Sequence, residues 1–592
     1  MFAGLEVKLR WAKWVVLGLV LLFGASALFL ALSARRPALR ISSAELTNVV
    51  REVMSVGECY RSPEPNHQLT ELAYMKSMDR GRGVVLVDLA GGSRQAIPLK
   101  AEARFLFSWS LDDRYLLLKD APNYNEQLLL YDAAGPSFQP ATKEKCFYVE
   151  QAAWVGTNRF AYISKQGNSA EVRLVTPGQA HRILRAFPDP SKTDWLAAWS
   201  DGRLAFLQNG QIWAQAPEAD AAEQLTTNLW PQHLWLNYAS KTGQLLFCSN
   251  DDSDWRHLFK MDTTPGNQGK VTQLTFGPDH SYNGQWIQGG AGFTYVGNIS
   301  NHFYLAVRPA DPKLSTNLFV GGHVVGYRTA VDGNTLFAAA ALGMEPTGIW
   351  RYDIDKRALK CVAPGTNRPF AKAQVLAARQ CWTESYDHLK VPYYLIEPRA
   401  IDARSSYPLV LAVPPESGQF VQAWEKYGQC LANIGAFYAA VNPRGSDGYG
   451  KQFRQNDPEE AWRDILAVRQ QLLHMPNIDR KRCFLLTWSN GSQAVNKAVQ
   501  AHPRSWAGVI LLSGVAPSSE MRQRSLPPYF IFMGGMDRRG FRPLAENFKE
   551  WADTNGGDVT LMLDPKTTHI ITDVNVDRRI GFALADFIFH HH

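Results

Sequence analysis

Ser489 lies in the stretch of this chain that most clearly indicates chemistry. An apolar run beginning at 484 stops at this serine, and a turn of small residues and a helix-like segment at 493–500 follow. A strand, a tight turn and a helix in this order predict a nucleophile elbow, the bend that holds a reactive serine hydroxyl above a sheet. The usual elbow pattern is G-x-S-x-G, and here Thr487 stands in place of the first glycine.

Two further side chains are placed to act with this serine. Asp537 follows the apolar run at 529–533, and His569 follows the apolar run at 559–563. The order Ser, Asp, His is the chain order of the catalytic triads of α/β-hydrolases. Each candidate comes just after an expected strand, and sheets of this kind gather their active sites at the carboxyl ends of the strands. The pattern predicts a Ser489–Asp537–His569 triad for acyl transfer.

Each of these residues, taken alone, has an ordinary structural explanation. A serine in a turn usually stabilises that turn, and an aspartate after a strand usually caps a helix. The order of the three residues, each after an apolar run, favours a shared site over three independent structural roles.

Two kinds of element alternate from about residue 380 onward and would position the triad. Helix-like runs at 459–473 and 543–554 lie between strand-like apolar runs. This alternation is typical of a mostly parallel sheet covered by helices on both faces. It predicts an α/β-hydrolase domain over 366–592, with strands at 409–413, 437–441, 484–486, 509–512, 529–533 and 559–563.

A loose repeat of about 40 residues fills the segment 60–365. Each copy has a polar turn with Asp or Gly, a short apolar strand, a polar loop and a second strand, as at 109–132 and 332–353. Seven copies predict a β-propeller with seven blades, although faint copies leave six or eight open. A β-sandwich is the alternative, but a sandwich does not repeat one turn-and-strand pattern in this way.

The chain opens with a segment that predicts a membrane anchor. Residues 14–34 contain no charged side chain and, at about 1.5 Å per helical residue, would cross a hydrocarbon core about 30 Å thick. A cleaved signal peptide is the alternative, but its apolar region is normally shorter. We expect a cytoplasmic tail at 1–13, a transmembrane helix at 14–34 and a linker at 35–59. The protein would then be a single-pass membrane protein with its C-terminal domains on the extracytoplasmic side.

Composition and charge argue against several other classes of protein. The 592 residues, 45% hydrophobic and 20% charged, describe a folded protein of more than one domain. The net charge of +7 is small for this length, and no basic run with interleaved aromatic residues is present, so we expect no nucleic-acid partner. The seven cysteines form no C-x-x-C pair, so we expect no structural zinc. We also expect no cofactor, and the sequence leaves an oligomer possible.

An anchor, a propeller and a C-terminal hydrolase together resemble the prolyl oligopeptidase family of serine peptidases, which includes dipeptidyl and acylaminoacyl peptidases. The most specific match lies at 441–450, which is similar to the family's N-x-R-G-S-x-G-Y-G stretch. The segments 478–482 and 459–464 are similar to its D-x-x-R and W-x-D elements. In the repeats, 255–258 and 273–275 resemble propeller phrases of the family.

The resemblance covers nearly all of the chain after residue 45 and implies roles for the candidate residues. Ser489 would be the nucleophile, Asp537 the acid and His569 the base of a peptidase. The backbone N–H of Asn490 would donate to the oxyanion. Short peptides are the implied substrates, because the propeller of such enzymes limits access by size.

The chain departs from the family's pattern near this site. Pro414 follows the strand at 408–413, where several branches carry a tyrosine that donates to the oxyanion, and proline offers neither a hydroxyl nor an N–H. Thr487 and Ser492 replace glycines of the elbow, where a β-branched residue risks backbone strain. The propeller segment also has no Glu-Glu pair of the kind with which dipeptidyl peptidases hold an amino terminus.

These departures leave three functions open. The first is a membrane-anchored serine peptidase that hydrolyses short peptides. The second is a catalytically weak or inactive relative whose propeller binds a peptide or protein partner. The third is an esterase that uses the same triad. The loss of one oxyanion donor costs about 2.7–4 kcal/mol of transition-state stabilisation, which a slow enzyme would tolerate.

Overall fold

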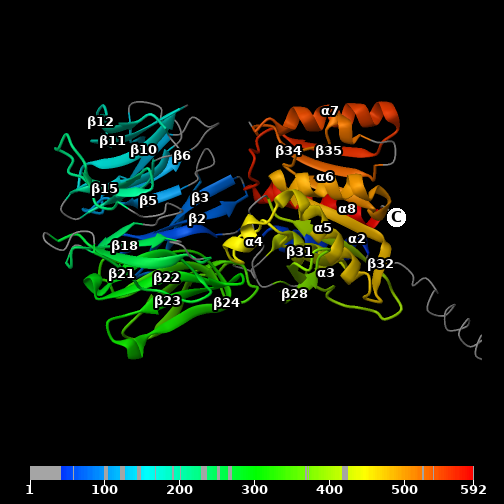
Figure 1. Ribbon diagram of the computed structural model, residues 1–592, viewed down its shortest axis with the longest axis horizontal. Helices are drawn as coiled ribbons and strands as arrows, with labels where there is room; N and C mark the ends of the chain where they lie inside the picture. The colour runs from blue at the N-terminus through cyan, green and yellow to red at the C-terminus, as the bar shows by residue number, and fades with distance from the viewer. Residues whose placement is uncertain are drawn as a thin grey trace, which may run out of the picture.

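The computed structural model describes residues 42–590, apart from gaps at 58, 80, 99–104, 121–126, 136, 143–148, 167, 190–192, 200–201, 228–235, 240, 250–253, 265–269, 367–369, 371–372, 416–424, 523–525 and 538. A propeller of β-sheets and an α/β domain lie side by side (Figure 1). Within the described part of the chain, no helix is both long and apolar enough to span a bilayer. The anchor expected at 14–34 lies outside the described residues.

Five four-stranded antiparallel sheets form the first five blades of the propeller. Their strands are β1 (Cys59–Pro65), β2 (Glu71–Met78), β3 (Gly81–Asp88) and β4 (Arg94–Pro98); β5 (Phe105–Trp109), β6 (Tyr115–Asp120), β7 (Gln127–Asp132) and β8 (Ser137–Pro140); β9 (Val149–Trp154), β10 (Phe160–Gln166), β11 (Ser169–Val175) and β12 (Arg182–Phe187); β13 (Thr193–Ala198), β14 (Leu204–Gln208), β15 (Gln211–Gln215) and β16 (Glu223–Gln224); and β17 (Asn237–Ala239), β18 (Gln244–Ser249), β19 (His257–Asp262) and β20 (Val271–Gln273).

The last two blades share one long strand. β24 (Thr316–Thr329) pairs with β23 through its first half and with β25 through its second half. Positive φ angles at Phe319 and Gly321 mark the irregularity between the halves. The described residues therefore form seven blades, which confirms the predicted number. The remaining strands are β21 (His280–Ile287), β22 (Gly292–Ile299), β23 (His302–Arg308), β25 (Thr335–Ala341), β26 (Gly348–Asp353) and β27 (Ala358–Ala363).

The polar turns that define the repeat close the hairpins of the blades. Between β24 and β25, the Asp332 carboxylate accepts hydrogen bonds from the backbone N–H groups of Asn334 and Thr335, each at 2.9 Å. A side chain that satisfies two backbone donors in this way fixes the turn and sets the register of the strands that follow. The Asp and Gly positions that revealed the repeat are therefore the residues that form its turns.

The ring closes where the first blade meets the seventh. Apolar side chains of β2 and β3 pack against those of β25 and β26 in one buried cluster. Beside this cluster, the Arg328 Nε donates to both carboxylate oxygens of Glu64 at 3.0 Å, and its Nη2 also donates. Burial raises the pKa of Glu64 to about 7, although Arg328 acts to lower it. The seam is thus held by apolar packing and by an ion pair with one buried partner.

We expect Arg328→Met to destabilise the propeller in a pH-dependent way. Arg328 is the group that lowers the pKa of Glu64 against the effect of burial. Without Arg328, this pKa rises further above its value in the unfolded chain. A carboxyl group with a raised pKa contributes stability that is full below its unfolded pKa and is lost as pH rises. Urea unfolding should show that the variant has a free energy of unfolding about 3 kcal/mol lower than that of the wild type at about pH 8, with a smaller difference at about pH 5.

The control for this variant is the double change Glu64→Gln with Arg328→Met. Both partners are then neutral, so the free energy of unfolding should no longer fall with pH through this site. A loss in Arg328→Met that is equal at both pH values would contradict the assigned role of the buried carboxylate.

An eight-stranded sheet forms the centre of the second domain, in the order β28-β29-β31-β30-β32-β33-β34-β35. The first two strands pair antiparallel, and from β31 onward all neighbours are parallel. The carboxyl ends of the parallel strands therefore meet at one edge. The strands are β28 (Ala378–Glu384), β29 (Lys390–Ile396), β30 (Tyr407–Val413), β31 (Phe437–Val441), β32 (Ile478–Trp488), β33 (Gly508–Leu512), β34 (Tyr529–Gly534) and β35 (Val559–Asp564).

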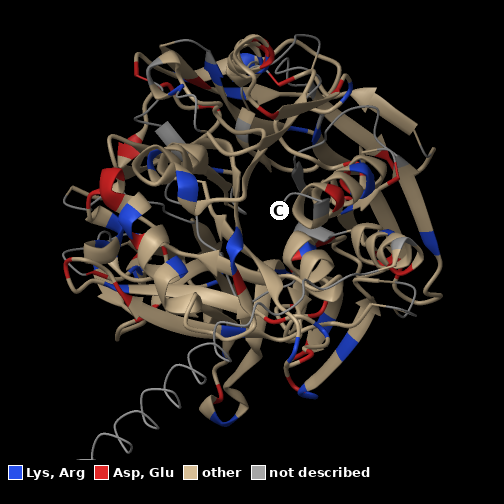
Figure 2. Cartoon of the chain, turned by 90° about the vertical axis from the view of Figure 1, so that its right-hand side faces the viewer, with Lys and Arg blue, Asp and Glu red and all other residues tan. Residues whose placement is uncertain are grey.

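Helices cover both faces of this sheet, as the alternating pattern predicted. One apolar layer lies under α5, α6 and α7, and the other lies under α2, α3 and α8. Seen from the side of this domain, basic and acidic residues are interspersed along the ribbon (Figure 2). The helices are α2 (Ser43–Met54), α3 (Lys426–Asn433), α4 (Lys451–Gln455), α5 (Ala461–Leu472), α6 (Ser492–Ala501), α7 (Phe541–Asn555) and α8 (Val574–His590), with single turns η3 (Gln288–Gly290), η4 (Pro312–Leu314), η5 (Pro458–Glu460), η6 (Ser489–Gly491), η7 (Pro503–Ser505) and η8 (Ser519–Met521).

Helix α2 lies in the segment that the sequence analysis treated as a linker. The Ser42 hydroxyl caps it by accepting from the N–H of Glu45 at 3.2 Å. Val49, Val50 and Val53 are fully buried in the core beneath α3 and α8. Apolar residues at this spacing form one face of a helix, and that face is the reason for its burial. The α/β domain therefore contains a segment from before the propeller as well as the segment after it.

Candidate active site

Ser489 lies at the bend between β32 and α6. It begins the single turn η6 and has a φ of +49°, a left-handed conformation that residues other than glycine rarely adopt. A strained turn of this kind is characteristic of a nucleophile elbow, because it exposes the hydroxyl above the edge of the sheet. The strand, turn and helix expected around Ser489 are all present.

Hydrogen bonds accommodate the two residues that replace glycines of the elbow. Thr487 is buried, and its hydroxyl donates to the carbonyl of Val413 at the end of β30 at 2.9 Å. The Ser492 hydroxyl donates to the carbonyl of Ser489 at 2.6 Å and accepts from the N–H of Val515 at 2.8 Å. Both side chains therefore fasten the elbow to the strands on its two sides. Sequence reasoning treated them as sources of strain and missed this role.

Gly491 is the glycine of the elbow for which no larger residue fits. A Cβ at this position would lie 2.2 Å from the carbonyl oxygen of Pro414 and 2.5 Å from the hydroxyl oxygen of Thr487. We expect Gly491→Ala to lower the rate at which a fluorophosphonate labels Ser489 by about a hundredfold, because a displacement of about 1 Å at a reacting group has that effect. Gly135→Ala is the matched control, since a Cβ there meets no atom within 4 Å. An unchanged labelling rate in Gly491→Ala would show that the elbow tolerates the shift.

The structure brings the three sequence-predicted residues together. Asp537 follows β34, and His569 lies in the loop between β35 and α8. The His569 Nδ1 lies 2.7 Å from Asp537 Oδ2, and the His569 Nε2 lies 2.9 Å from Ser489 Oγ. The three side chains form one continuous hydrogen-bonded row, within the distances that proton transfer requires.

The environment of the row sets the direction of each hydrogen bond. The carboxylate of Asp537 is fully buried, and the His569 ring is 9% exposed. Burial acts to raise the pKa of Asp537, but hydrogen bonds from His569 and from the N–H of Arg539 outweigh it, so this pKa is lowered. An ionised carboxylate can only accept, so Nδ1 carries the proton and Nε2 is left to accept from the serine hydroxyl. No group of His, Cys, Asp or Glu within the described segments is arranged to hold a metal ion.

Contacts between the two loops hold Asp537 and His569 at this separation. The N–H of Met536 donates to the carbonyl of Thr567 at 3.0 Å. A Cβ at Gly534 would lie 2.2 Å from the carbonyl of Thr568, so only glycine allows the loops to approach this closely. Asp564 accepts from the hydroxyl of Thr567 at 2.9 Å and also pairs with Arg579. Sequence reasoning missed Asp564, although its place at the end of a strand, followed by proline, is a signal for a fixed turn.

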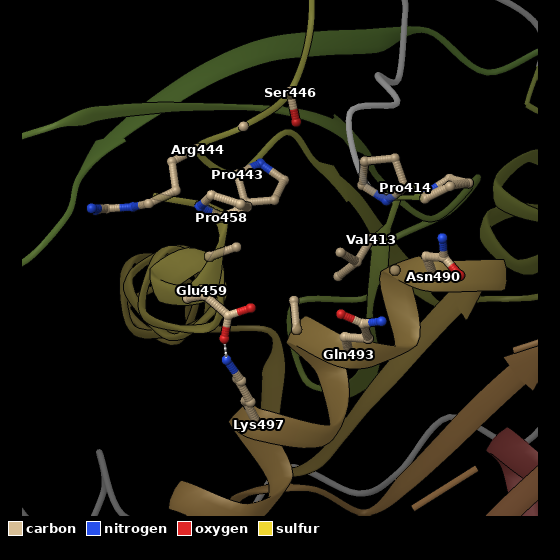
Figure 3. A pocket seen from close by; sticks show the side chains of 15 residues that line it. Val413, Pro414, Pro443, Arg444, Ser446, Pro458, Glu459, Asn490, Gln493 and Lys497 are labelled. Atoms are coloured by element: carbon tan, nitrogen blue, oxygen red, sulfur yellow. Dashed lines mark ion pairs between the residues drawn. The ribbon is translucent and has the colours of Figure 1, made fainter. Parts of the chain in front are cut away.

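A pocket adjoins the elbow on the side of β30 and β31. Pro414 and Asn490 lie close together on one side of it, and the ion pair of Glu459 and Lys497 lies at the other (Figure 3). Asn490 is in the first turn after β32, where backbone N–H groups have no partner within the helix. Its N–H is therefore available to a developing oxyanion. Pro414 is buried beside it and has no N–H to add.

Several known proteins have a similar architecture. Residues 424–524 match the model of the prolyl oligopeptidase family. A structure from a study of two prolyl endopeptidases is similar over 95% of this chain and 92% of its own, with a TM-score of 0.77 and 13% identity. A puromycin-hydrolysing peptidase of Mycobacterium tuberculosis covers 94% of this chain and 98% of its own, with a TM-score of 0.76 and 14% identity. The acylaminoacyl peptidase of Pyrococcus horikoshii covers 92% and 97%, with a TM-score of 0.68 and 13% identity. No curated protein matches the chain.

At these identities the structural likeness establishes the fold, which is that of a propeller joined to an α/β-hydrolase. The family match lies within the hydrolase domain and includes Ser489. This match and the structural likeness support the resemblance to the prolyl oligopeptidase family that the sequence motifs indicated.

Proposed function

We propose that this protein is a serine peptidase that hydrolyses short peptides through Ser489, His569 and Asp537. The observation that carries the proposal is the hydrogen-bonded row from Ser489 Oγ through the imidazole to the buried carboxylate, at 2.9 and 2.7 Å. Prolyl oligopeptidase-type relatives act on peptides, which supports the choice of substrate class.

The proposed reaction has two stages. The Ser489 Oγ attacks the scissile carbonyl while His569 Nε2 takes the hydroxyl proton, and Asp537 stabilises the imidazolium that forms. The N–H of Asn490 donates to the oxyanion of the tetrahedral intermediate. The C–N bond then breaks, the imidazolium gives its proton to the leaving amine, and an acyl-enzyme remains. In the second stage, water activated by His569 attacks the ester and releases the acid and the free serine.

The test is to incubate the full chain with a fluorophosphonate and to locate the modified residue by mass spectrometry. The expected result is one modified serine at 489, with labelling slowed by an added peptide mixture that the enzyme cleaves. A peptide-library digest with the same preparation gives the cleavage preference. A modified residue elsewhere would show that the nucleophile is assigned wrongly.

A second candidate function rests on Pro414. It occupies the position beside Asn490 at which a second oxyanion donor would be expected, and it has no donor to offer. In this alternative the chain binds peptides or a protein partner without turnover, and the hydrolase domain serves as a scaffold. Absence of fluorophosphonate labelling, together with peptide binding by calorimetry, would favour this function over the peptidase.

We further propose that residues 14–34 anchor the protein in a membrane, with the propeller and the hydrolase on the extracytoplasmic side. The support is the uncharged length of this segment. Membrane fractionation tests the anchor, and protease treatment of intact cells tests on which side of the membrane the large domains lie. The expected result is a membrane-bound protein whose large domains are digested from outside, and a full-length chain in the soluble fraction would contradict the anchor.

A further inference from the structure

A cavity lies between the two domains, and its lining begins one residue after the loop that lines the pocket at the elbow. It has a volume of about 560 Å³, part of which is open to solvent. The propeller contributes the segment before β19 and the start of β21, and the hydrolase contributes the segment 447–455, which includes α4. Figure 1 shows α4 between the two domains. A backbone hydrogen bond of 3.0 Å from the N–H of Lys451 to the carbonyl of Asp254 joins the two sides.

The floor of this cavity is polar and buried. Arg256 and His280 are each 4% exposed, and the Arg256 Nη1 lies 3.4 Å from the carboxylate of Asp447. The backbone N–H of Arg256 donates to His280 Nδ1 at 3.0 Å, so the ring proton of the neutral imidazole is on Nε2. Burial lowers the pKa of His280 to about 4, and Arg256 acts in the same direction. His280 is therefore neutral and adds no charge at neutral pH.

The charges that line the cavity do not balance. Three cationic side chains, Arg256, Lys451 and Arg454, face two carboxylates, Asp254 and Asp447. Burial acts to raise the pKa of Asp447, but the charges of Arg256 and Arg454 outweigh this effect and lower the pKa. Asp447 is therefore ionised and interacts electrostatically with both arginines. No ion pair joins Lys451 or Arg454 to a carboxylate within 4.0 Å among the described residues. One further carboxylate would neutralise the cluster.

A single loop lines both this cavity and the pocket that adjoins the nucleophile elbow. Ser446 lines the pocket that contains Asn490, and the next residue, Asp447, lines the interdomain cavity. When a peptide is bound for attack by Ser489 and extends across this loop, a residue on one side of its scissile bond would reach Lys451 and Arg454. We propose that the interdomain cavity is a substrate subsite that binds a carboxylate of the peptide through Arg454 and Lys451. This inference rests on the proposed peptidase function and assigns a specificity to it.

The carboxylate has two possible sources, an acidic side chain or the carboxyl terminus of the peptide. Two series of matched fluorogenic peptides distinguish them. In one series Glu replaces Gln at successive positions, and in the other the carboxyl terminus is free or amidated. We expect a carboxylate at one position, from Glu or from the free terminus, to raise kcat/KM by about tenfold over the neutral match, because hydrogen bonds between ionised groups are roughly twice as strong as neutral ones. In Arg454→Gln the ratio of kcat/KM between the carboxylate peptide and its neutral match should fall to about one. In Arg454→Glu a peptide with a basic residue at this position should be preferred.

The control variant is Lys549→Gln, which removes a partly exposed cation of α7 whose partner is Asp553. It should retain the preference for the carboxylate. Binding of the same peptides to Ser489→Ala, followed by fluorescence anisotropy, gives a second measurement that needs no turnover. If no peptide is cleaved but acidic peptides bind in an Arg454-dependent way, the peptidase function fails and the subsite stands. If peptides are cleaved without preference for a carboxylate, or if Arg454→Gln folds normally and keeps the preference, the subsite is wrong.

Discussion

Ser489→Ala should abolish both fluorophosphonate labelling and peptide hydrolysis, with a loss of about a millionfold in kcat. The substitution removes only the hydroxyl group of Ser489, whose oxygen lies 2.9 Å from His569 Nε2. Alanine adopts the observed φ of +49° no less readily than serine, so the fold and the melting temperature should not change. Hydrolysis is measured by release of a fluorogenic leaving group, and labelling by in-gel fluorescence.

Ser513→Ala is the matched control for this change. Ser513 lies directly after β33, is buried, and also has a φ of +49°. The same atom is therefore removed from a similar backbone position on the neighbouring strand, outside the row of hydrogen bonds. Activity should stay close to that of the wild type. Equal losses in the two variants would point to damaged structure, and residual labelling in Ser489→Ala would point to another nucleophile.

Asp537→Asn should lower kcat by about ten-thousandfold while the protein stays folded. The carboxylate can only accept from His569 Nδ1, whereas an amide also presents N–H donors to that nitrogen. The imidazole then places its proton on Nε2, which can no longer accept from Ser489. Kinetics with the fluorogenic peptide measure the loss, and circular dichroism checks the fold.

The matched control for this variant is Asp553→Asn in α7, where the carboxylate is exposed and pairs with Lys549. It should leave kcat unchanged. The outcome that contradicts the role of Asp537 is a loss of less than about tenfold, because the tautomer would then not depend on this carboxylate.

The sequence was sufficient to predict that the three candidate residues lie together, because each residue follows an apolar strand of a parallel sheet. In such a sheet all the strands end at one edge, so chain order alone brings Ser489, Asp537 and His569 near one another. The propeller was predictable for a similar reason. Its turns depend on residues such as Asp332, which bond only to their sequence neighbours.

The parts that the sequence did not predict depend on contacts between distant residues. The hydroxyl of Thr487 bonds to Val413, and that of Ser492 bonds to Val515, so neither partner is apparent from the local pattern. Helix α2 is not apparent in the sequence because its apolar face is short and the core that it covers is formed mainly by residues after the propeller. The cavity at Arg454 likewise exists only where two domains meet.

The burial of α2 also has a consequence for the synthesis of the chain. Its apolar face packs on α8, where a Cβ at Gly581 would lie 3.1 Å from Val50 and 2.7 Å from Met54. These partners leave the ribosome roughly half a minute to two minutes after α2, at about 5–20 residues per second. Throughout that interval the propeller blades can form from local hairpins, while α2 still lacks the part of its packing surface that α8 provides. The apolar face of α2 is therefore covered only in part until α8 emerges, and the α/β-hydrolase domain is completed only at the end of translation.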